Sequence, residues 1–300
     1  MKKILVLFIC FASSLCYGDA PKPWQLGFQD AVTPVMEQIN SFHNLLLWIV
    51  FGISIFVFIL LGYTCWRFAE KRNPVPSKTT HNTAIEVIWT VIPVLILIVI
   101  SIPSLRLLYF MDKVDDPEVT LKAIGHQWYW EYDYPEQGVA FDSYMIPDAQ
   151  IKPGQKRLLE VDNSVVLPVD TNVRILTTST DVIHSFGVPA FGIKQDSVPG
   201  RLAEVWVRVT KPGVYYGQCY ELCGMNHGFM PIRVEVVSRA DYNKWITARG
   251  GKTLDAVAAE KLIVPSLSPT EVVALAPTEM AAAASTSIDV APAQLTTNDS

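Results

Sequence analysis

Two long runs of apolar residues lie in the first third of the chain, and a short polar segment separates them. The runs cover residues 45–66 and 87–110, and the second contains a single charged residue, Arg106, near its end. Each run is long enough for the ~20 residues that a helix needs to cross the hydrocarbon core of a bilayer. The pattern predicts a hairpin of two transmembrane helices within residues 21–111.

The polar segments around these runs indicate how the hairpin is oriented. The basic residues between the runs are Arg67, Lys71, Arg72 and Lys78. Basic loops of this kind remain on the cytoplasmic side of a bacterial membrane. Residues 1–20 combine a lysine pair, an apolar run and small residues, as an export signal peptide does; an uncleaved first anchor is the alternative. We therefore expect a bacterial inner-membrane protein with both ends of the mature chain on the periplasmic side.

After residue 111 the pattern changes to short segments rich in β-branched and aromatic residues. Turn sequences such as IKPGQ, SVPGR and TKPGV separate several of them. Short strands bounded by turns are typical of an all-β sandwich or barrel, so residues 112–250 are predicted to form one β domain. The expected strand-rich segments are 119–134, 155–168, 171–179, 201–209, 213–219 and 231–237.

Residues 251–300 differ from the rest of the chain in composition. They are rich in Ala, Pro, Thr, Ser and Val and contain no aromatic residue. Such a segment offers little apolar surface for a packed core, so we expect a tail that is disordered or weakly helical. The whole sequence contains no CxxCH motif, which excludes a covalently attached haem of the c type.

The overall composition fits a membrane protein with a water-facing domain. Hydrophobic residues make up 50% of the chain, charged residues 18%, and the mean hydropathy is +0.26. The net charge of −5 argues against a nucleic-acid partner and fits a partner with a positive surface. Cys10 and Cys16 lie in the expected signal and Cys65 in an apolar run, which leaves Cys219 and Cys223 for the exported domain.

The sequence CYELCGMNHGFMP, which begins at Cys219, gathers thiol, imidazole and thioether groups in one loop. Blue-copper sites use such groups, namely two histidines, one cysteine and a distant methionine. Cys223, His227 and Met230, with His184 from an earlier segment, would suffice for one copper ion. Cys219 then adds a second thiolate, and two thiolates with two histidines could bridge two metal ions.

Three other interpretations of these residues remain open at this point. Cys219 and Cys223 could form a disulfide, because the exported domain faces an oxidising compartment. Zn²⁺ on two cysteines and two histidines is chemically reasonable, although the spacing differs from that of zinc fingers and ribbons. A membrane-tethered copper carrier is the third interpretation, and it would hold its metal through labile, exposed ligands.

Several motifs together resemble subunit 2 of the haem–copper cytochrome c oxidases. They are CYELCGMNHGFMP, DVIHSF, GHQWYWEYDY, FDSYM, RLLEVDN and SVPGR, and two apolar spans precede them. The likeness extends from about Trp24 to Trp245. It implies a mixed membrane and all-β protein, with a two-helix transmembrane hairpin followed by a cupredoxin-like Greek-key β-sandwich. In this family the sandwich holds a dinuclear copper centre called CuA.

The resemblance implies ligands for two metal sites. The side-chain ligands of the two copper ions would be His184, Cys219, Cys223, His227 and Met230. Glu221 would bind copper through its backbone carbonyl and, through its carboxylate, a magnesium or manganese ion shared with subunit 1. The equivalent subunit of quinol oxidases lacks the copper ligands, so the complete set argues against that family.

The resemblance also implies roles for residues outside the ligand set. Trp128 would be the point where electrons from cytochrome c enter, and Glu86 would lie at the mouth of a proton-uptake path in subunit 1. The acidic residues that would dock cytochrome c are Asp133, Asp142, Asp162 and Asp181. An acidic patch speeds the encounter with a lysine-rich partner. The chain would thus pass electrons to the haem of subunit 1, in a complex with subunit 3, for oxygen reduction coupled to proton pumping.

Overall fold

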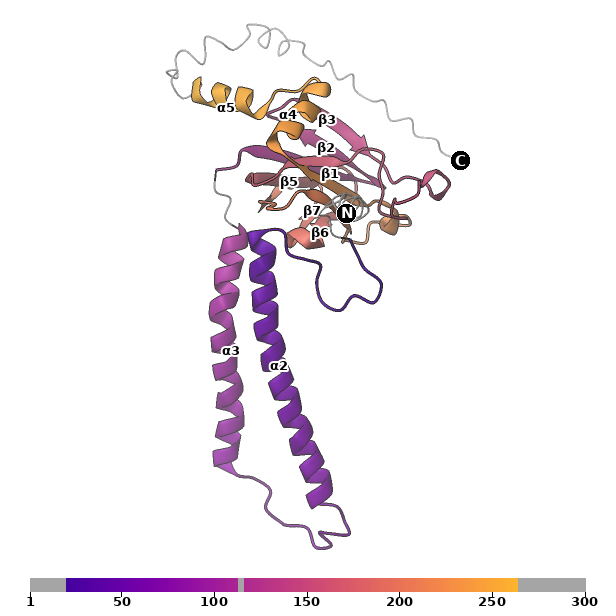
Figure 1. Cartoon of the computed structure of the whole chain (residues 1–300). Helices are drawn as coiled ribbons and strands as arrows, with labels where there is room; N and C mark the ends of the chain where they lie inside the picture. The colour runs from indigo at the N-terminus through magenta and orange to yellow at the C-terminus, as the bar shows by residue number, and fades with distance from the viewer. Residues whose placement is uncertain (1–19, 113–115, 264–300) are drawn as a thin grey trace, which may run out of the picture. The chain divides into compact units, whose positions relative to one another are not determined.

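The structure is a computed structural model, and it describes residues 20–112 and 116–263. Two long helices are followed by a β domain, as the sequence pattern predicts (Figure 1). Apart from its last residue, the expected signal segment lies outside the described residues. The same holds for residues 264–300 of the expected tail.

The hairpin consists of α2, Pro34–Arg67, and α3, Thr83–Asp112. The two helices contain the apolar runs predicted from the sequence, and both are long and apolar enough to cross a membrane. They lie side by side (Figure 1). Most of their apolar side chains are exposed, as expected of surfaces that lipid or neighbouring helices cover in a bilayer.

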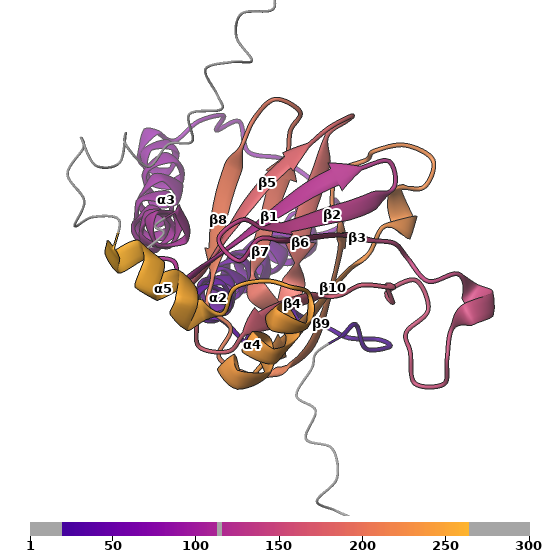
Figure 2. The same ribbon diagram turned by 90° about the horizontal axis from the view of Figure 1, so that it is seen from above.

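The β domain consists of two five-stranded sheets that pack face to face (Figure 2). One sheet has the order β3-β2-β1-β5-β8, and the other has the order β4-β10-β9-β6-β7. β1 pairs with β5, and β4 with β10, in parallel, whereas the other neighbours are antiparallel. The strands are β1 Val119–His126, β2 Tyr129–Tyr134, β3 Val139–Ser143, β4 Val165–Pro168, β5 Val173–Ser179, β6 His184–Val188, β7 Ile193–Ser197, β8 Ala203–Val207, β9 Gly213–Cys219 and β10 Ile232–Val237.

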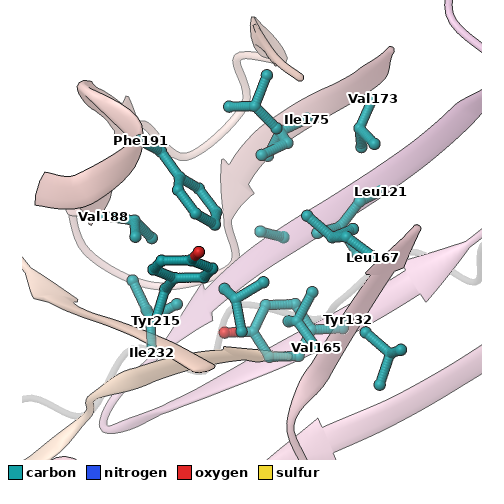
Figure 3. Packing of buried hydrophobic residues seen from close by; sticks show 14 of the residues in the cluster. Leu121, Tyr132, Val165, Leu167, Val173, Ile175, Val188, Phe191, Tyr215 and Ile232 are labelled. Atoms are coloured by element: carbon teal, nitrogen blue, oxygen red, sulfur yellow. The ribbon is translucent and has the colours of Figure 1, made fainter. Parts of the chain in front are cut away.

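The core of the domain lies between the two sheets because alternate side chains of each strand point inward. In β2, for example, Trp130, Tyr132 and Tyr134 are fully buried while the residues between them are partly exposed. Figure 3 shows side chains of both sheets in this core, among them Leu121, Ile175, Val165, Leu167 and Ile232. The predicted sandwich is therefore confirmed.

Hydrogen bonds join both helices of the hairpin to the sandwich. Thr33 caps α2: its Oγ1 accepts from the backbone N–H of Met36 at 3.0 Å and donates to the carbonyl of Phe191 at 2.7 Å. In the last turn of α3, the carbonyl of Phe110 accepts from Trp206 Nε1 at 3.2 Å. The last carbonyls of a helix lack partners within the helix, so this bond satisfies one of them.

Two expected strand segments differ in the structure. Residues 119–134 form two strands, because a turn at Gln127 and Trp128 separates β1 from β2. In the segment 155–168, only Val165–Pro168 pairs as a strand. The earlier part forms turns, and Leu158 adopts a left-handed backbone conformation with φ 65°.

The end of the β domain also differs from the expectation. After the last strand the chain forms a helix, α4, Arg239–Ala248, whose Tyr242 and Ile246 are buried. Beyond it, the backbone N–H of Lys252 donates to the carbonyl of Gln137 at 2.9 Å, and Leu254 lies in the domain core. The packed domain therefore extends to Leu254 rather than ending at residue 250. A further helix, α5, occupies Leu254–Ile263, at the start of the expected tail.

Candidate metal centre

Two of the predicted ligands come from neighbouring strands of the second sheet. His184 is the first residue of β6 and Cys219 is the last residue of β9. The two strands are antiparallel, with Phe186 opposite Cys219. Residues two apart on a strand share a face, so His184 and Cys219 are diagonal neighbours. Cys219 Sγ lies 3.9 Å from His184 Nδ1, and both side chains are buried.

The other ligands lie in the loop between β9 and β10, together with the short helix η3, His227–Phe229. Cys223 Sγ lies 3.6 Å from His227 Nδ1 and 3.6 Å from Met230 Sδ. Cys219 Sγ lies 3.9 Å from Cys223 Sγ and 3.3 Å from the carbonyl oxygen of Glu221. The structure thus brings together all six predicted ligands of the copper site.

The two cysteines are free thiols in this structure. The distance between their sulfur atoms, 3.9 Å, is almost twice the length of a disulfide bond, ~2.05 Å. One imidazole nitrogen approaches each sulfur. Because each sulfur has its own imidazole, the site is arranged as two similar halves that share a central pair of sulfur atoms.

The donor set of two thiols, two imidazoles, a thioether and a carbonyl fits copper better than Zn²⁺, because zinc rarely uses thioether or carbonyl ligands.

The two thiols differ in their electrostatic environment. Burial raises the pKa of Cys219, but hydrogen bonds from His184 and neighbouring groups outweigh it and lower this pKa to about 7. Burial and the adjacent Cys219 sulfur raise the pKa of Cys223 to about 12. Two thiolates this close repel each other, which opposes ionisation of the second thiol. A cation bound between them would offset this repulsion and favour ionisation of both thiols.

Asp181 orients the imidazole of His184. Its Oδ1 lies 2.8 Å from His184 Nε2. An Nε2–H that donates to this carboxylate leaves the lone pair of Nδ1 facing Cys219, which is the arrangement that a metal ligand needs. Burial would lower the pKa of His184, but the bonds to Cys219 and Asp181 raise it above its ordinary value.

Three glycines allow the chain to approach closely around the ligands. A Cβ on Gly125 of β1 would lie 2.7 Å from the His184 ring, and one on Gly187 of β6 would lie 2.5 Å from the ring of Tyr220. A Cβ on Gly224 would lie 3.0 Å from Trp128, and Gly224 has φ +119°, which disfavours other residues. The absence of these side chains therefore makes room for a ligand and two aromatic rings.

Trp128 lies in the turn between β1 and β2 and contacts the ligand loop. Its Nε1 donates to the carbonyl of Cys223 at 3.1 Å, and its side chain is partly exposed. Gln127 Nε2 donates to the same carbonyl at 2.8 Å. Trp130, which is fully buried, donates from Nε1 to the carbonyl of Met230 at 3.2 Å. The first sheet therefore holds the ligand loop through three side chains.

The acidic residues predicted to dock cytochrome c lie in different surroundings. Asp142 and Asp162 are exposed and meet at Tyr144, whose hydroxyl donates to Asp142 at 3.4 Å and whose backbone N–H donates to Asp162 at 2.7 Å. Asp133 is half-buried on β2, where burial raises its pKa despite nearby Lys122. Asp181 is bonded to His184, so it belongs to the metal site whatever its role in docking.

Glu86 lies in the first turn of α3. Its Oε1 accepts from the backbone N–H of Asn82 at 3.3 Å, while the Asn82 side chain accepts from Ala84 and Ile85. This reciprocal arrangement resembles a capping box, with the glutamate one position further along the helix, and it stabilises the start of the helix. Glu86 therefore has a local structural role in this chain.

Some supporting residues were not predicted from the sequence. Gly125, Gln127 and Trp130 contact ligands or the ligand loop, and Asp181 was predicted in a different role. The spacing of Asp181, three positions before His184, was an available signal, because a carboxylate often binds the second nitrogen of a ligating histidine. The others contact residues far away along the chain.

Two family models match this chain. The family described as cytochrome c oxidase subunit II, periplasmic domain, matches residues 119–237, and the family described as its transmembrane domain matches residues 21–107. The two matches include all of α2, most of α3 and all six predicted copper ligands.

Curated relatives are similar over most of the chain. A Rickettsia felis protein named probable cytochrome c oxidase subunit 2 is 53% identical over 250 residues, which cover 82% of this chain and 79% of that protein. Cytochrome c oxidase subunit 2 of Arabidopsis thaliana is 51% identical over 251 residues, which cover 81% of this chain and 96% of that protein.

A solved structure is also similar. It is the periplasmic domain of subunit II of cytochrome oxidase of Bradyrhizobium japonicum, which is 46% identical, with a TM-score of 0.43, and covers 46% of this chain and 97% of that one. The family matches and the curated relatives together settle the assignment. The chain belongs to the cytochrome c oxidase subunit 2 family, the members of which are membrane-bound parts of an oxidoreductase complex.

Proposed function

We propose that this chain holds a dinuclear copper centre of the CuA type, which accepts single electrons from cytochrome c and passes them to the haem of subunit 1. The observation that carries the proposal is the central pair of thiols, 3.9 Å apart, with one imidazole nitrogen beside each sulfur. A site for one copper ion needs one thiolate, whereas this pair offers a bridge between two ions.

The residues of the chain have separate tasks at this centre. Cys219 and Cys223 would bind both ions, His184 and His227 would each bind one, and Met230 and the Glu221 carbonyl would complete the ligand set. Copper held by these residues would supply one-electron redox chemistry. Asp181 keeps His184 Nδ1 available as a ligand, and the side chains of Cys219, Cys223 and Met230 are buried, whereas His227 is partly exposed.

Electrons would enter through Trp128. Its indole is partly exposed and bonded to Cys223, so it provides a short covalent and hydrogen-bonded path from the surface to a ligand. Asp142 and Asp162, with Asp133 and Asp181, would attract the positive surface of cytochrome c. Attraction between charged surfaces weakens as salt rises, so the association rate should fall with ionic strength.

The remaining partners would be the other subunits and the membrane. The Glu221 carboxylate would bind magnesium or manganese together with subunit 1, and the exposed apolar faces of α2 and α3 would contact subunits 1 and 3 and lipid. Glu86 would lie beside a proton-uptake path of subunit 1. The copper domain would lie on the periplasmic side of the bacterial inner membrane, after export directed by a signal peptide. The complex would then act as a proton-translocating oxidase.

The test is copper loading of the full chain purified in detergent. We expect two copper ions per chain and, after partial reduction, an electron paramagnetic resonance pattern from one electron shared by two equivalent copper nuclei. One copper ion per chain, zinc in preference to copper, or a colourless disulfide would overturn the proposal. A single, readily exchanged copper ion would favour a copper carrier instead.

The role of Trp128 in electron entry can be tested separately in the assembled oxidase. Trp128→Phe keeps an aromatic ring but removes the indole N–H that bonds Cys223. We expect electron transfer from reduced cytochrome c to slow severely while the copper spectrum is unchanged. An unchanged rate would exclude Trp128 from this role.

A further inference from the structure

Gln127 contacts the supports of two different metal ligands. Its backbone N–H donates to Asp181 Oδ2 at 2.7 Å, and its side-chain Nε2 donates to the carbonyl of Cys223 at 2.8 Å. The other oxygen of the Asp181 carboxylate lies 2.8 Å from His184 Nε2. One residue is therefore linked directly to a thiol ligand and, through a single carboxylate, to an imidazole ligand.

The sheet topology shows why such a link matters. Trp128 and Gln127 belong to the turn between β1 and β2, in the first sheet, whereas β6, β9 and β10, which carry or flank the ligands, belong to the second. Strand pairing fixes the ligand strands relative to one another, but it does not fix the turn relative to the ligands. Contacts between side chains and the ligand loop must therefore hold Trp128 in place.

The Cys223 carbonyl is where these contacts meet. A carbonyl oxygen has two lone pairs, and Gln127 and Trp128 each donate one hydrogen bond to it. Gly224 leaves space for both, because a Cβ there would lie 3.0 Å from Trp128 Cζ2 and 3.1 Å from Gln127 Nε2. Without the Gln127 amide, water would take its place at the carbonyl, and water does not restrain the turn.

We propose that Gln127 is a positioning residue that holds the Trp128 indole against Cys223. The proposal rests on the proposed function, because Trp128 is taken as the point where electrons enter. Gln127 does not itself contact the metal or the donor of electrons in this proposal. Its effect on electron transfer must therefore act through Trp128.

The first test is a double-mutant cycle in the assembled oxidase. Gln127→Met keeps the length of the side chain and removes the amide donor, and Gln150→Met, at an exposed position of the same domain, is the control. We expect Gln127→Met to retain two copper ions and to slow electron transfer from reduced cytochrome c about fivefold to tenfold, as the loss of one hydrogen bond allows. In the Trp128→Phe background the same change should cause no further loss. Equal losses in both backgrounds would overturn the proposal, because a general structural effect is additive.

The second test does not depend on copper. In the copper-free chain in detergent, the indole N–H resonance of Trp128, measured after isotopic labelling of tryptophan, should shift in Gln127→Met and stay unchanged in Gln150→Met. An unchanged resonance in Gln127→Met would overturn the positioning role. If the wild-type chain fails to bind a copper pair, or if Trp128→Phe has the wild-type rate, the proposed function fails, and the resonance still decides whether Gln127 positions Trp128.

Discussion

Replacement of Gly125 by alanine tests whether the first sheet sets the position of His184. A Cβ at this position of β1 would lie 2.7 Å from Cδ2, 2.8 Å from Cγ and 2.9 Å from Cβ of His184. Carbon atoms in contact are normally ~3.5–4.0 Å apart, so the imidazole or the strand must move by about 1 Å. The strand is hydrogen-bonded to β2 on one side and β5 on the other, so it is less able to move than the imidazole.

The size of the effect follows from how tightly the imidazole is held. The His184 side chain is 0% exposed, its ring lies 6.0 Å from the ring of Trp130, and its Nε2 is bonded to Asp181. Overpacking a buried site costs about 1–3 kcal/mol, so we expect Gly125→Ala to lower the free energy of unfolding of the copper-free chain by that amount. Displacing a ligand that a carboxylate orients should also lower copper affinity about 10–100-fold.

Both quantities can be measured on the full chain in detergent, by urea unfolding without copper and by competition with a chelator. Gly228→Ala is the matched control, because a Cβ there meets no atom within 4 Å although the residue lies in the ligand loop. If Gly125→Ala keeps the wild-type copper affinity and spectrum, the close approach of β1 does not determine where His184 lies, and the reasoning is refuted.

Three further substitutions test other contacts. Asp181→Asn places an amide donor where the carboxylate accepts from both Gln127 and His184. Competition with a chelator should then show at least about a tenfold loss of copper affinity, whereas Asp148→Asn, at an exposed position, should show no loss. Glu160 is buried, accepts a hydrogen bond from Tyr216 and lies 3.0 Å from Arg233 Nε. Because Glu160→Gln breaks this buried ion pair, it should lower the free energy of unfolding in urea by about 3 kcal/mol, and an unchanged urea midpoint would contradict this. Thr33→Ala removes the cap of α2 and the bond to Phe191, and should cost about 1–2 kcal/mol, seen as a lower melting temperature; an unaltered melting temperature would show that the cap contributes nothing.

The helices and most strands could be predicted because their physical signals are local. A membrane span needs a continuous apolar run, and a strand with one buried face alternates, as β2 does. The segment 155–164 was misinterpreted as part of a strand because its apolar residues resemble one. Its first part instead bonds within local turns, where Leu159 N–H donates to the carbonyl of Lys156, and Val161 forms only an isolated bridge with Met145; the sequence of the segment does not reveal this choice.

The ligands could be predicted from residue type, but the contacts that hold them could not. Thiols, imidazoles and a thioether within one short loop have few other uses, so the donor set was visible in the sequence. Gln127 and Cys223, by contrast, are 96 positions apart, and a glutamine beside tryptophan has no chemistry that signals such a bond. Asp181 was expected on a docking surface because the family resemblance implied that role, whereas its bond to His184 is determined by the fold.

The placement of the ligands explains why both sheets are needed for electron transfer. An electron moves fastest when the ligands need not rearrange as the charge of the metals changes. The pairing of β6 with β9 fixes His184 beside Cys219, but Cys223 and Met230 lie in a loop, which strand pairing holds at its ends alone. The carbonyls of these two loop residues accept hydrogen bonds from the β1–β2 turn and from β2. The sheet that supplies no predicted ligand therefore restrains the part of the site that the other sheet leaves free, and the same bonds would connect the surface to a bound metal.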